Sequence, residues 1–211
     1  MPMASIRRLP LVLASASPRR RALLTMIGCP FEVVPAAVDE DAVGSDGGTH
    51  PGELVEAVAG RKAEAVVPRF PRRLVLAADT IVVVDGEVLG KPKDADDAVR
   101  MLERLSGRWH EVYTGVALAR GDSGLMDVRH ARTDVRFVSL KPAWIQHYVK
   151  TGEPLDKAGA YGIQGRGSMF VAEIRGCYFN VVGLPLAMVA AMLEEAGVSP
   201  FACGYNGGPI S

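Results

Sequence analysis

Cysteine is scarce in this sequence, and neither sign of charge predominates. The 211 residues include three widely separated cysteines, Cys29, Cys177 and Cys203, and none forms a CxxC pair. This pattern argues against a disulfide framework and a thiolate zinc site, and it indicates a reducing compartment, which we expect to be the cytoplasm. The 24 basic residues balance 24 acidic residues. The chain therefore has no general attraction to nucleic acids or membranes, and any binding of anions must be local.

Several patterns with well-known functions are also missing. The sequence has no apolar run long enough to cross a membrane, and the apolar stretch near its start is too short for a signal peptide. It contains no P-loop, no GxGxxG after a strand, no HExxH and no GxSxG. Its four histidines are scattered, which argues against a zinc site or histidine-based acid–base catalysis. We therefore expect neither nucleic acid nor membrane among the partners of this protein.

The length and composition of the chain are typical of a globular α/β enzyme. With 48% hydrophobic and 23% charged residues, the chain can bury a substantial core. Apolar runs alternate with helical periodicities early in the chain and give way to paired strands later, which predicts an α/β fold with a mixed sheet. We expect one catalytic domain at residues 9–197, preceded by a flexible leader at 1–8 and followed by a disordered tail at 198–211.

Apolar runs, helix caps and turn residues predict the individual elements. Strands are expected at residues 9–14, 31–37, 74–78, 81–84, 87–89, 109–119 and 128–140. Helices are expected at residues 20–27, 51–67, 94–105, 142–149 and 184–196. Asp85-Gly86 indicates a two-residue hairpin turn, and residues 169–174 and 177–182 are expected to form a closing hairpin.

The start of the first helix is the most informative candidate site. Ser17 is a good N-cap, and the proline after it suits the first helical position. Arg19, Arg20 and Arg21 then crowd the positive end of the helix dipole, where each cation is disfavoured by roughly 0.3–1 kcal/mol. Free backbone N–H groups, the hydroxyls of Ser15 and Ser17 and the guanidinium groups predict a site for a polyanion. The alternative is that the arginines are solvated or paired with carboxylates.

Two acidic positions are candidates for holding a metal ion. Asp79 ends a predicted buried strand, where a carboxylate is costly unless it is paired or binds a metal, and where α/β sheets place ligands. The alternative is an aspartate that caps a turn. Glu40 is the natural second carboxylate, although the sequence does little to separate it from its neighbours Asp39 and Asp41. Such a pair suits Mg²⁺, which takes one or two carboxylates together with phosphate oxygens.

Two lysines are candidate clamps for phosphate groups. Lys62 lies late in its predicted helix, and Lys91 follows the predicted hairpin and precedes a proline. Taken singly, each could be an ordinary surface lysine, and for Lys62 that is the default interpretation. Either lysine can act as a phosphate ligand only if the other candidate residues lie close to it in the folded protein.

A glycine-rich stretch at residues 151–167 also carries charged, amide and apolar side chains, which predicts a shaped loop rather than a linker. Asp156 and Lys157 could form a salt bridge that shapes this loop. Gln164, among the glycines, offers both a hydrogen-bond donor and an acceptor, which suits recognition of the edge of a nucleobase. The alternative is a glutamine that only fixes the backbone of the loop.

Four of these stretches together resemble the Maf family of nucleoside triphosphate pyrophosphatases. They are SASPRR at 15–20, ADTIV at 78–82, LGKP at 89–92 and DKAGAYGIQG at 156–165. They occur in the order and spacing of the family across residues 9–197, and four motifs in register are far more specific than any one of them.

The resemblance implies a fold related to the inosine-triphosphate pyrophosphatases. That fold has an elongated mixed β-sheet flanked by helices, with two lobes around a central cleft. The implied reaction is hydrolysis of a nucleoside triphosphate to the monophosphate and pyrophosphate, with a divalent cofactor, Mg²⁺ or Mn²⁺. The resemblance also implies that the protein can form a homodimer and that it acts as a house-cleaning enzyme linked to arrest of cell division.

The resemblance further implies roles for single residues. Asp79 matches the acidic catalytic residue of the family. Arg19, Thr80 and Gln164 match positions linked to substrate choice, in the combination typical of the branch that prefers dTTP and UTP, including modified pyrimidines. Other cleft positions are matched by Ser17, Arg20, Glu40, Lys62 and Lys91. Two further hypotheses are the branch that hydrolyses 7-methyl-GTP and a nucleotide-binding regulator of septation without turnover.

Overall fold

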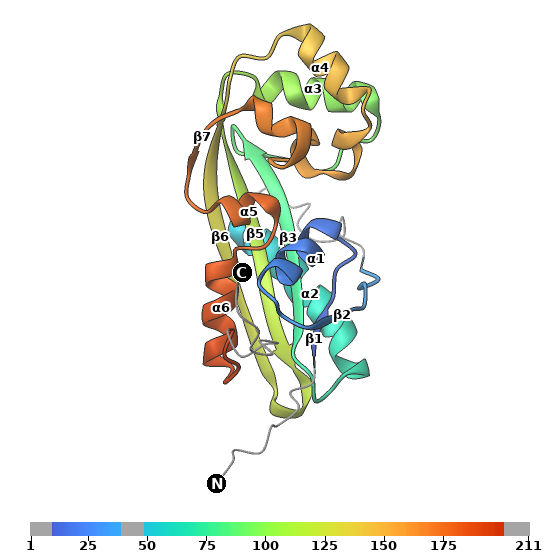
Figure 1. Ribbon diagram of the computed structural model, residues 1–211, viewed down its shortest axis with the longest axis vertical. Coiled ribbons are helices and arrows are strands. Elements are labelled where there is room, and N and C mark those ends of the chain that lie inside the picture. The colour runs from blue at the N-terminus through green and yellow to red at the C-terminus, as the bar shows by residue number, and fades with distance from the viewer. Residues whose placement is uncertain (1–9, 39–48, 201–211) are drawn as a thin grey trace, which may run out of the picture.

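A computed structural model describes residues 10–38 and 49–200, and within them one sheet of seven strands supports the fold (Figure 1). The strands are β1 Leu11–Leu13, β2 Phe31–Val33, β3 Val75–Val84, β4 Glu87–Leu89, β5 Trp109–Arg120, β6 Leu125–Phe137 and β7 Val171–Arg175. The helices are α1 Pro18–Met26, α2 Pro51–Val66, α3 Ala95–Leu105, α4 Pro142–Val149, α5 Tyr178–Val182 and α6 Leu186–Glu195. Short 3₁₀ turns are η1 Val67–Arg69, η2 Gly121–Ser123, η3 Glu153–Asp156, η4 Ala158–Ala160 and η5 Gly165–Phe170. The predicted leader and most of the predicted tail lie outside the described residues.

The sheet is mixed, as predicted. Its strands lie in the order β2-β1-β3-β5-β6-β7, and β4 pairs with β3. β1 runs parallel to β2 and β3, whereas β3, β5, β6 and β7 pair antiparallel in succession. Parallel neighbours need crossover connections, which α1 and α2 supply, while short turns suffice for the antiparallel strands. None of the helices in the described parts of the chain has the length and apolarity needed to cross a bilayer.

Helices cover both faces of this sheet. α2 buries Ala59 in an apolar cluster with Ala77 of β3 on one face. α1 and α6 contribute to the larger cluster on the other face, which contains Ala78. Because successive strand residues point to opposite faces, Asp79 lies on the α2 side and Thr80 on the α1 side. Figure 1 shows α3 and α4 gathered at one end of the long strands, apart from α1 and β1.

β3 differs from the prediction because it continues through Asp79. The sequence indicated a strand end there, but Asp79 lies inside a strand of ten residues, and pairing with β5 is continuous through it. The opposite edge of β3 is where the pairing stops. β1 pairs with β3 only as far as Leu76, and β4 pairs from Val82 onward. Between these two residues no strand of the described chain pairs with that edge, which leaves room for a cavity beside Asp79.

The segment at 177–182 also differs, since a hairpin strand was predicted and the chain forms α5. The backbone N–H of Cys177 donates to Thr133 Oγ1 (3.1 Å). The buried Asn180 amide donates to Thr133 Oγ1 and to the backbone oxygen of Val112, both at 3.0 Å. These contacts with β5 and β6 hold the segment in a helical turn, and tertiary packing overrides the β-propensity of its apolar residues. The predicted hairpin at Asp85-Gly86 is confirmed by the pairing of β3 with β4.

Gly115 on β5 allows α2 to approach the sheet closely. A Cβ atom at this position would lie 2.2 Å from the backbone oxygen of Val55 and 2.8 Å from the backbone nitrogen of Glu56. Helix backbone cannot move aside cheaply, so we expect Gly115→Ala to lower the free energy of unfolding by about 2–3 kcal/mol. Urea denaturation measures this change.

The matched control is Gly60→Ala, inside α2 itself. A Cβ atom there would meet only Val128 Cγ2, at 4.0 Å. Alanine should therefore raise the free energy of unfolding by roughly 0.5–1 kcal/mol, because it costs less conformational entropy than glycine in a helix. Equal stability of the two variants would contradict the close approach of α2 to β5.

Candidate active site

A cavity of about 1030 Å³ lies along the open edge of β3. Nine of the predicted site residues line it: Ser15, Ser17, Arg19, Arg20, Lys62, Asp79, Thr80, Lys91 and Gln164. They come from α1 and the turn before it, from α2, from β3, from the segment after β4, and from the glycine-rich loop. The remaining candidate, Glu40, lies outside the described residues, as do Asp39 and Asp41. The structure therefore brings distant segments of the sequence into one hollow.

The first turn of α1 has the N-cap that the sequence predicts. Ser17 is the N-cap, and its Oγ accepts a hydrogen bond from the backbone N–H of Arg20 (3.5 Å). Ser15 Oγ accepts one from the backbone N–H of Ser17 (3.2 Å). Because this turn lines the cavity, its N–H groups and the positive end of its dipole can act on an anion there.

Arg20 is the most firmly held of the three arginines. It is 9% exposed, and its Nε donates to the backbone oxygen of Gly183 (2.8 Å). Its Nη1 donates to Ser15 Oγ and its Nη2 to Thr80 Oγ1, both at 3.0 Å. These three hydrogen bonds fix the orientation of the guanidinium. Arg20 is therefore a fixed cation in the cavity wall.

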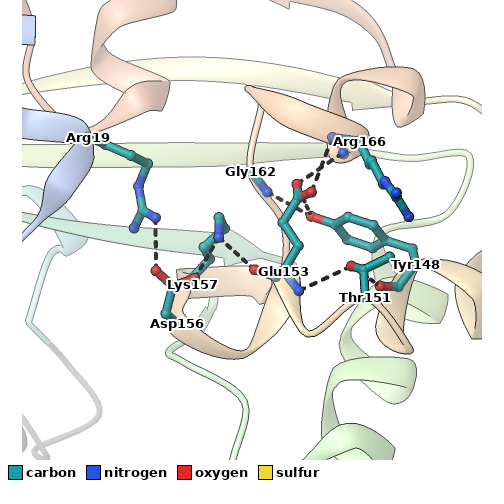
Figure 2. Close-up of polar contacts among 9 residues, drawn as sticks. Arg19, Tyr148, Thr151, Glu153, Asp156, Lys157, Gly162 and Arg166 are labelled. Atoms are coloured by element: carbon teal, nitrogen blue, oxygen red, sulfur yellow. Dashed lines mark hydrogen bonds and ion pairs between the residues drawn. The ribbon is translucent and has the colours of Figure 1, made fainter. Parts of the chain in front are cut away.

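Arg19 and Arg21 have different surroundings. Arg19 Nη1 donates to Asp156 Oδ2 (3.1 Å), and Asp156 also pairs with Lys157, which confirms the predicted salt bridge in the loop (Figure 2). Burial acts to raise the pKa of Asp156, but hydrogen bonds from Lys157 and Arg19 outweigh it and hold that pKa below its usual 3.8. Arg21 is exposed and is not among the residues that line the described cavity. The three arginines therefore differ in their surroundings: Arg19 forms an ion pair, Arg20 is held in the cavity wall, and Arg21 is exposed to solvent.

Lys62 and Asp79 form a nearly buried ion pair. Lys62 Nζ on α2 lies 2.8 Å from Asp79 Oδ1 on β3, and the two side chains are 8% and 14% exposed. The default interpretation of Lys62 as a surface lysine is therefore wrong. Burying one charge without a partner would be costly, so the pair explains how a carboxylate is tolerated inside a strand. Asp79 caps no turn, and its side chain lines the cavity.

The cavity wall also contains residues that were not predicted as ligands, among them Lys93, Lys157 and Tyr161. Lys93 follows Lys91 at a spacing of two, so a search for basic residues beside Lys91 could have found it. Tyr161 is buried, and its hydroxyl lies 2.8 Å from Nε2 of His110 on β5. Burial lowers the pKa of His110 to about 4, which keeps this imidazole neutral near pH 7. No local sequence pattern reveals such a contact.

The charges of the wall favour a polyanionic ligand. The described residues that line the cavity include six lysines and arginines but only two aspartates. Both aspartates are already paired with cations, Asp79 with Lys62 and Asp156 with Arg19 and Lys157. A ligand with several negative charges is therefore better accommodated than a neutral or cationic one.

The described residues supply few ligands for a metal ion. Among positions 10–38 and 49–200, no group of three or more His, Cys, Asp or Glu side chains could hold a metal by itself. Mg²⁺ usually keeps several waters and takes one or two carboxylates together with the phosphate oxygens of a substrate. Asp79 offers one carboxylate in a cavity suited to phosphates. The described residues therefore fit a site in which Asp79 provides one ligand of a divalent cation and the phosphate oxygens of a substrate provide others.

The chain is similar to known proteins over most of its length. Residues 10–196 match the family model described as Maf-like protein. The chain belongs to the Maf family. One relative is the dTTP/UTP pyrophosphatase of Symbiobacterium thermophilum, 58% identical over 194 residues, or 92% of this chain and 97% of that protein. Another, the dTTP/UTP pyrophosphatase of Moorella thermoacetica, is 55% identical over 188 residues, or 89% of this chain and 95% of that protein.

The solved structure of a protein from outside this group of relatives has the same fold as this chain. The Staphylococcus aureus Ham1 protein aligns with a TM-score of 0.51 at 14% identity, covering 89% of this chain and all of that one. At this identity the likeness concerns the fold alone. It confirms the prediction of an α/β protein with a mixed sheet flanked by helices.

Proposed function

We propose that this protein hydrolyses nucleoside triphosphates to the monophosphate and pyrophosphate, with dTTP and UTP as its preferred substrates. The observation that carries the proposal is the Lys62–Asp79 ion pair in a cavity whose wall is otherwise rich in cations. This arrangement combines a binding surface for a triphosphate with a carboxylate for acid–base chemistry. Relatives named dTTP/UTP pyrophosphatase, at 58% and 55% identity, support the same activity.

The triphosphate would bind against the first turn of α1. Arg20 is oriented by hydrogen bonds to Gly183 O, Ser15 Oγ and Thr80 Oγ1, so its guanidinium would meet phosphate oxygens from a defined direction. The backbone N–H groups of this turn would contribute hydrogen bonds, and Arg19 and Lys91 would add charge from the cavity wall. As in other phosphoryl transfers, catalysis would come mainly from positioning and from stabilisation of developing charge.

Asp79 would orient a water molecule for attack on the α-phosphorus. The water oxygen forms a bond to that phosphorus, and the bond from phosphorus to the α–β bridging oxygen breaks, so that pyrophosphate leaves. The carboxylate of Asp79 accepts the proton that the water releases, while Lys62 steadies the carboxylate through its hydrogen bond to Oδ1. A bound Mg²⁺ or Mn²⁺ ion, held by Asp79 and Glu40, would neutralise part of the phosphate charge.

Gln164 would recognise the pyrimidine. Its amide carries a donor and an acceptor, which complements a uracil or thymine edge that presents carbonyl oxygens and an N–H group. Gln164 is exposed and lines the same cavity as Arg19 and Thr80. These three residues match the family positions linked to substrate choice. Modified pyrimidine triphosphates with an unchanged pairing edge would be accepted as well.

Pyrophosphate release from a panel of triphosphates tests the proposed function. With Mg²⁺ present, we expect kcat/KM for dTTP and UTP to exceed that for dATP, dGTP and 7-methyl-GTP by about tenfold or more, because Gln164 leaves purine edges poorly paired. Chelation of the metal should abolish turnover. A preference for 7-methyl-GTP would instead assign the chain to the other branch. Nucleotide binding without any release would favour a regulator of septation that lacks turnover.

We further propose that the enzyme is cytoplasmic, forms a homodimer and has a house-cleaning role linked to arrest of cell division. The three separated cysteines support a reducing compartment. The balanced charge of the chain supports a small-molecule substrate rather than a nucleic acid or membrane partner. Dimerisation and the cell-division link are supported by the family resemblance.

A further inference from the structure

Glu153, at the start of η3, faces the loop that carries Gln164 (Figure 2). Its Oε1 accepts hydrogen bonds from the hydroxyl of Tyr148 (3.0 Å) and from the backbone N–H of Gly167 (3.3 Å). Its Oε2 accepts a hydrogen bond from the backbone N–H of Arg166 (3.2 Å). Three donors therefore converge on one half-buried carboxylate, and two of them are backbone groups that closely follow Gln164 in sequence.

The loop is also held before Gln164, through the same tyrosine. The backbone N–H of Gly162 donates to the hydroxyl oxygen of Tyr148 (3.2 Å). Burial raises the pKa of Tyr148 well above its ordinary value of 10, so the hydroxyl stays protonated and donates to Glu153. Tyr148 and Glu153 therefore act as one unit that contacts the loop on both sides of Gln164.

The support beneath this carboxylate is itself ordered. The backbone N–H of Glu153 donates to Thr151 Oγ1 (3.1 Å), and Thr151 Oγ1 donates to the backbone oxygen of Tyr148 (2.6 Å). Lys157 Nζ donates to the backbone oxygen of Glu153 (2.6 Å), as Figure 2 shows. Hydrogen bonds from the end of α4 to η3 thus fix the position from which the Glu153 side chain projects.

Glycine is needed where the loop passes the carboxylate. A Cβ atom on Gly165, which has φ +69°, would lie 3.1 Å from each carboxylate oxygen of Glu153. A larger residue would be strained by its backbone conformation and would push against the carboxylate. The glycine directly after Gln164 and the glutamate are therefore complementary parts of one contact.

We propose that Glu153 is a positioning residue for nucleobase recognition, because it fixes the backbone of residues 162–167 and thereby the orientation of Gln164 in the cavity. The proposal rests on the proposed function, in which Gln164 contacts the base. Glu153 is not among the residues that line the described cavity, so its effect on substrate passes through the loop. Hydrogen bonds to a carboxylate are about twice as strong as those between neutral groups, which suits this role.

The test is Glu153→Gln, which keeps the shape of the side chain but replaces one acceptor oxygen by an NH₂ group that must face a donor. We expect KM for dTTP to rise about tenfold or more, kcat to change by less than about threefold, and the preference for dTTP over dATP to fall. Inhibition by inorganic tripolyphosphate should be unchanged, because this probe has the phosphate groups but no base.

Two other variants complete the design. Glu195→Gln removes a carboxylate at the end of α6 from a surface ion pair with Arg129 of β6, and it should match the wild type in every measurement because neither residue lines the described cavity. Tyr148→Phe keeps the ring but removes the hydroxyl between Gly162 and Glu153, and it should change KM in the same direction by a smaller factor. If Glu153→Gln does not fold, the KM of Tyr148→Phe for dTTP tests the proposal instead.

An unchanged KM for dTTP in folded Glu153→Gln would overturn the proposal. Equal weakening of dTTP and tripolyphosphate binding would also overturn it, because a loss of general order affects both ends of the substrate. If the wild type releases no pyrophosphate from any triphosphate, the proposed function fails instead. Calorimetric affinities of wild type and variant for dTTP, dATP and tripolyphosphate then still show whether Glu153 governs base recognition.

Discussion

Replacement of Asp79 by asparagine is expected to lower kcat for dTTP by a factor of about 10²–10⁴, the range that a general base contributes. The new side chain would keep the size of the old one and an oxygen that accepts the hydrogen bond from Lys62 Nζ, now 2.8 Å from Asp79 Oδ1. It would lose the negative charge that attracts a proton and a metal ion. Steady-state pyrophosphate release measures the loss.

The fold and the binding of nucleotide should survive this change. Circular dichroism of Asp79→Asn should match the wild type and calorimetry should still detect dTTP, whereas the melting temperature should fall because the nearly buried Lys62 loses the charge of its partner. Asp127→Asn is the matched control, since Asp127 pairs with Arg129 on β6 and is not part of the described cavity wall. It should retain full activity. A folded Asp79→Asn protein with wild-type kcat would exclude Asp79 from the chemistry.

Replacement of Arg20 by lysine is expected to lower kcat/KM for dTTP by about 100-fold or more, although the charge is conserved. The guanidinium now reaches Gly183 O, Ser15 Oγ and Thr80 Oγ1 with three different nitrogens. A single ammonium group cannot satisfy this geometry and point a charge at the phosphates. Each buried acceptor left unpaired costs about 1–3 kcal/mol, so the free energy of unfolding should fall by about 2 kcal/mol as well.

Arg21→Lys is the control on the same helix. Arg21 is exposed and does not belong to the described cavity wall, so kcat/KM and stability should stay close to those of the wild type. Kinetics and urea denaturation of both variants provide the comparison. Wild-type kcat/KM in Arg20→Lys as well as in Arg21→Lys would show that positive charge at the start of α1, rather than the orientation of Arg20, determines activity.

Features that depend on neighbouring residues were predictable from the sequence. The cap at Ser17 uses hydrogen bonds within one turn, so the start of α1 and its anion-binding form follow from the local sequence. The hairpin at Asp85-Gly86 depends on backbone conformations that these two residues favour. The Asp156–Lys157 contact joins adjacent positions. The prediction of an anionic ligand also came from neighbouring residues, because several cations and the free backbone N–H groups of one helix start coincide there.

Contacts between distant segments were not predictable in this way. The sequence suggested a strand end at Asp79, whereas β3 continues, and the cavity lies where neither β1 nor β4, among the described strands, pairs with the edge of β3 between Leu76 and Val82. α5 replaces a predicted strand because Thr133 and Val112, on other strands, hydrogen-bond to that segment. Local propensity cannot include such partners, since they are brought close only by folding.

By itself, the sequence determined the family and the mixed α/β architecture and predicted a set of site residues, nine of which line one cavity, because these properties reside in motifs and local patterns. The tertiary structure decided which contacts each of those residues makes. It buried Lys62 against Asp79, oriented Arg20 and left Arg21 in solvent. It also placed Glu153 behind the loop of Gln164, because long-range packing determines which groups lose water and which partners they then need.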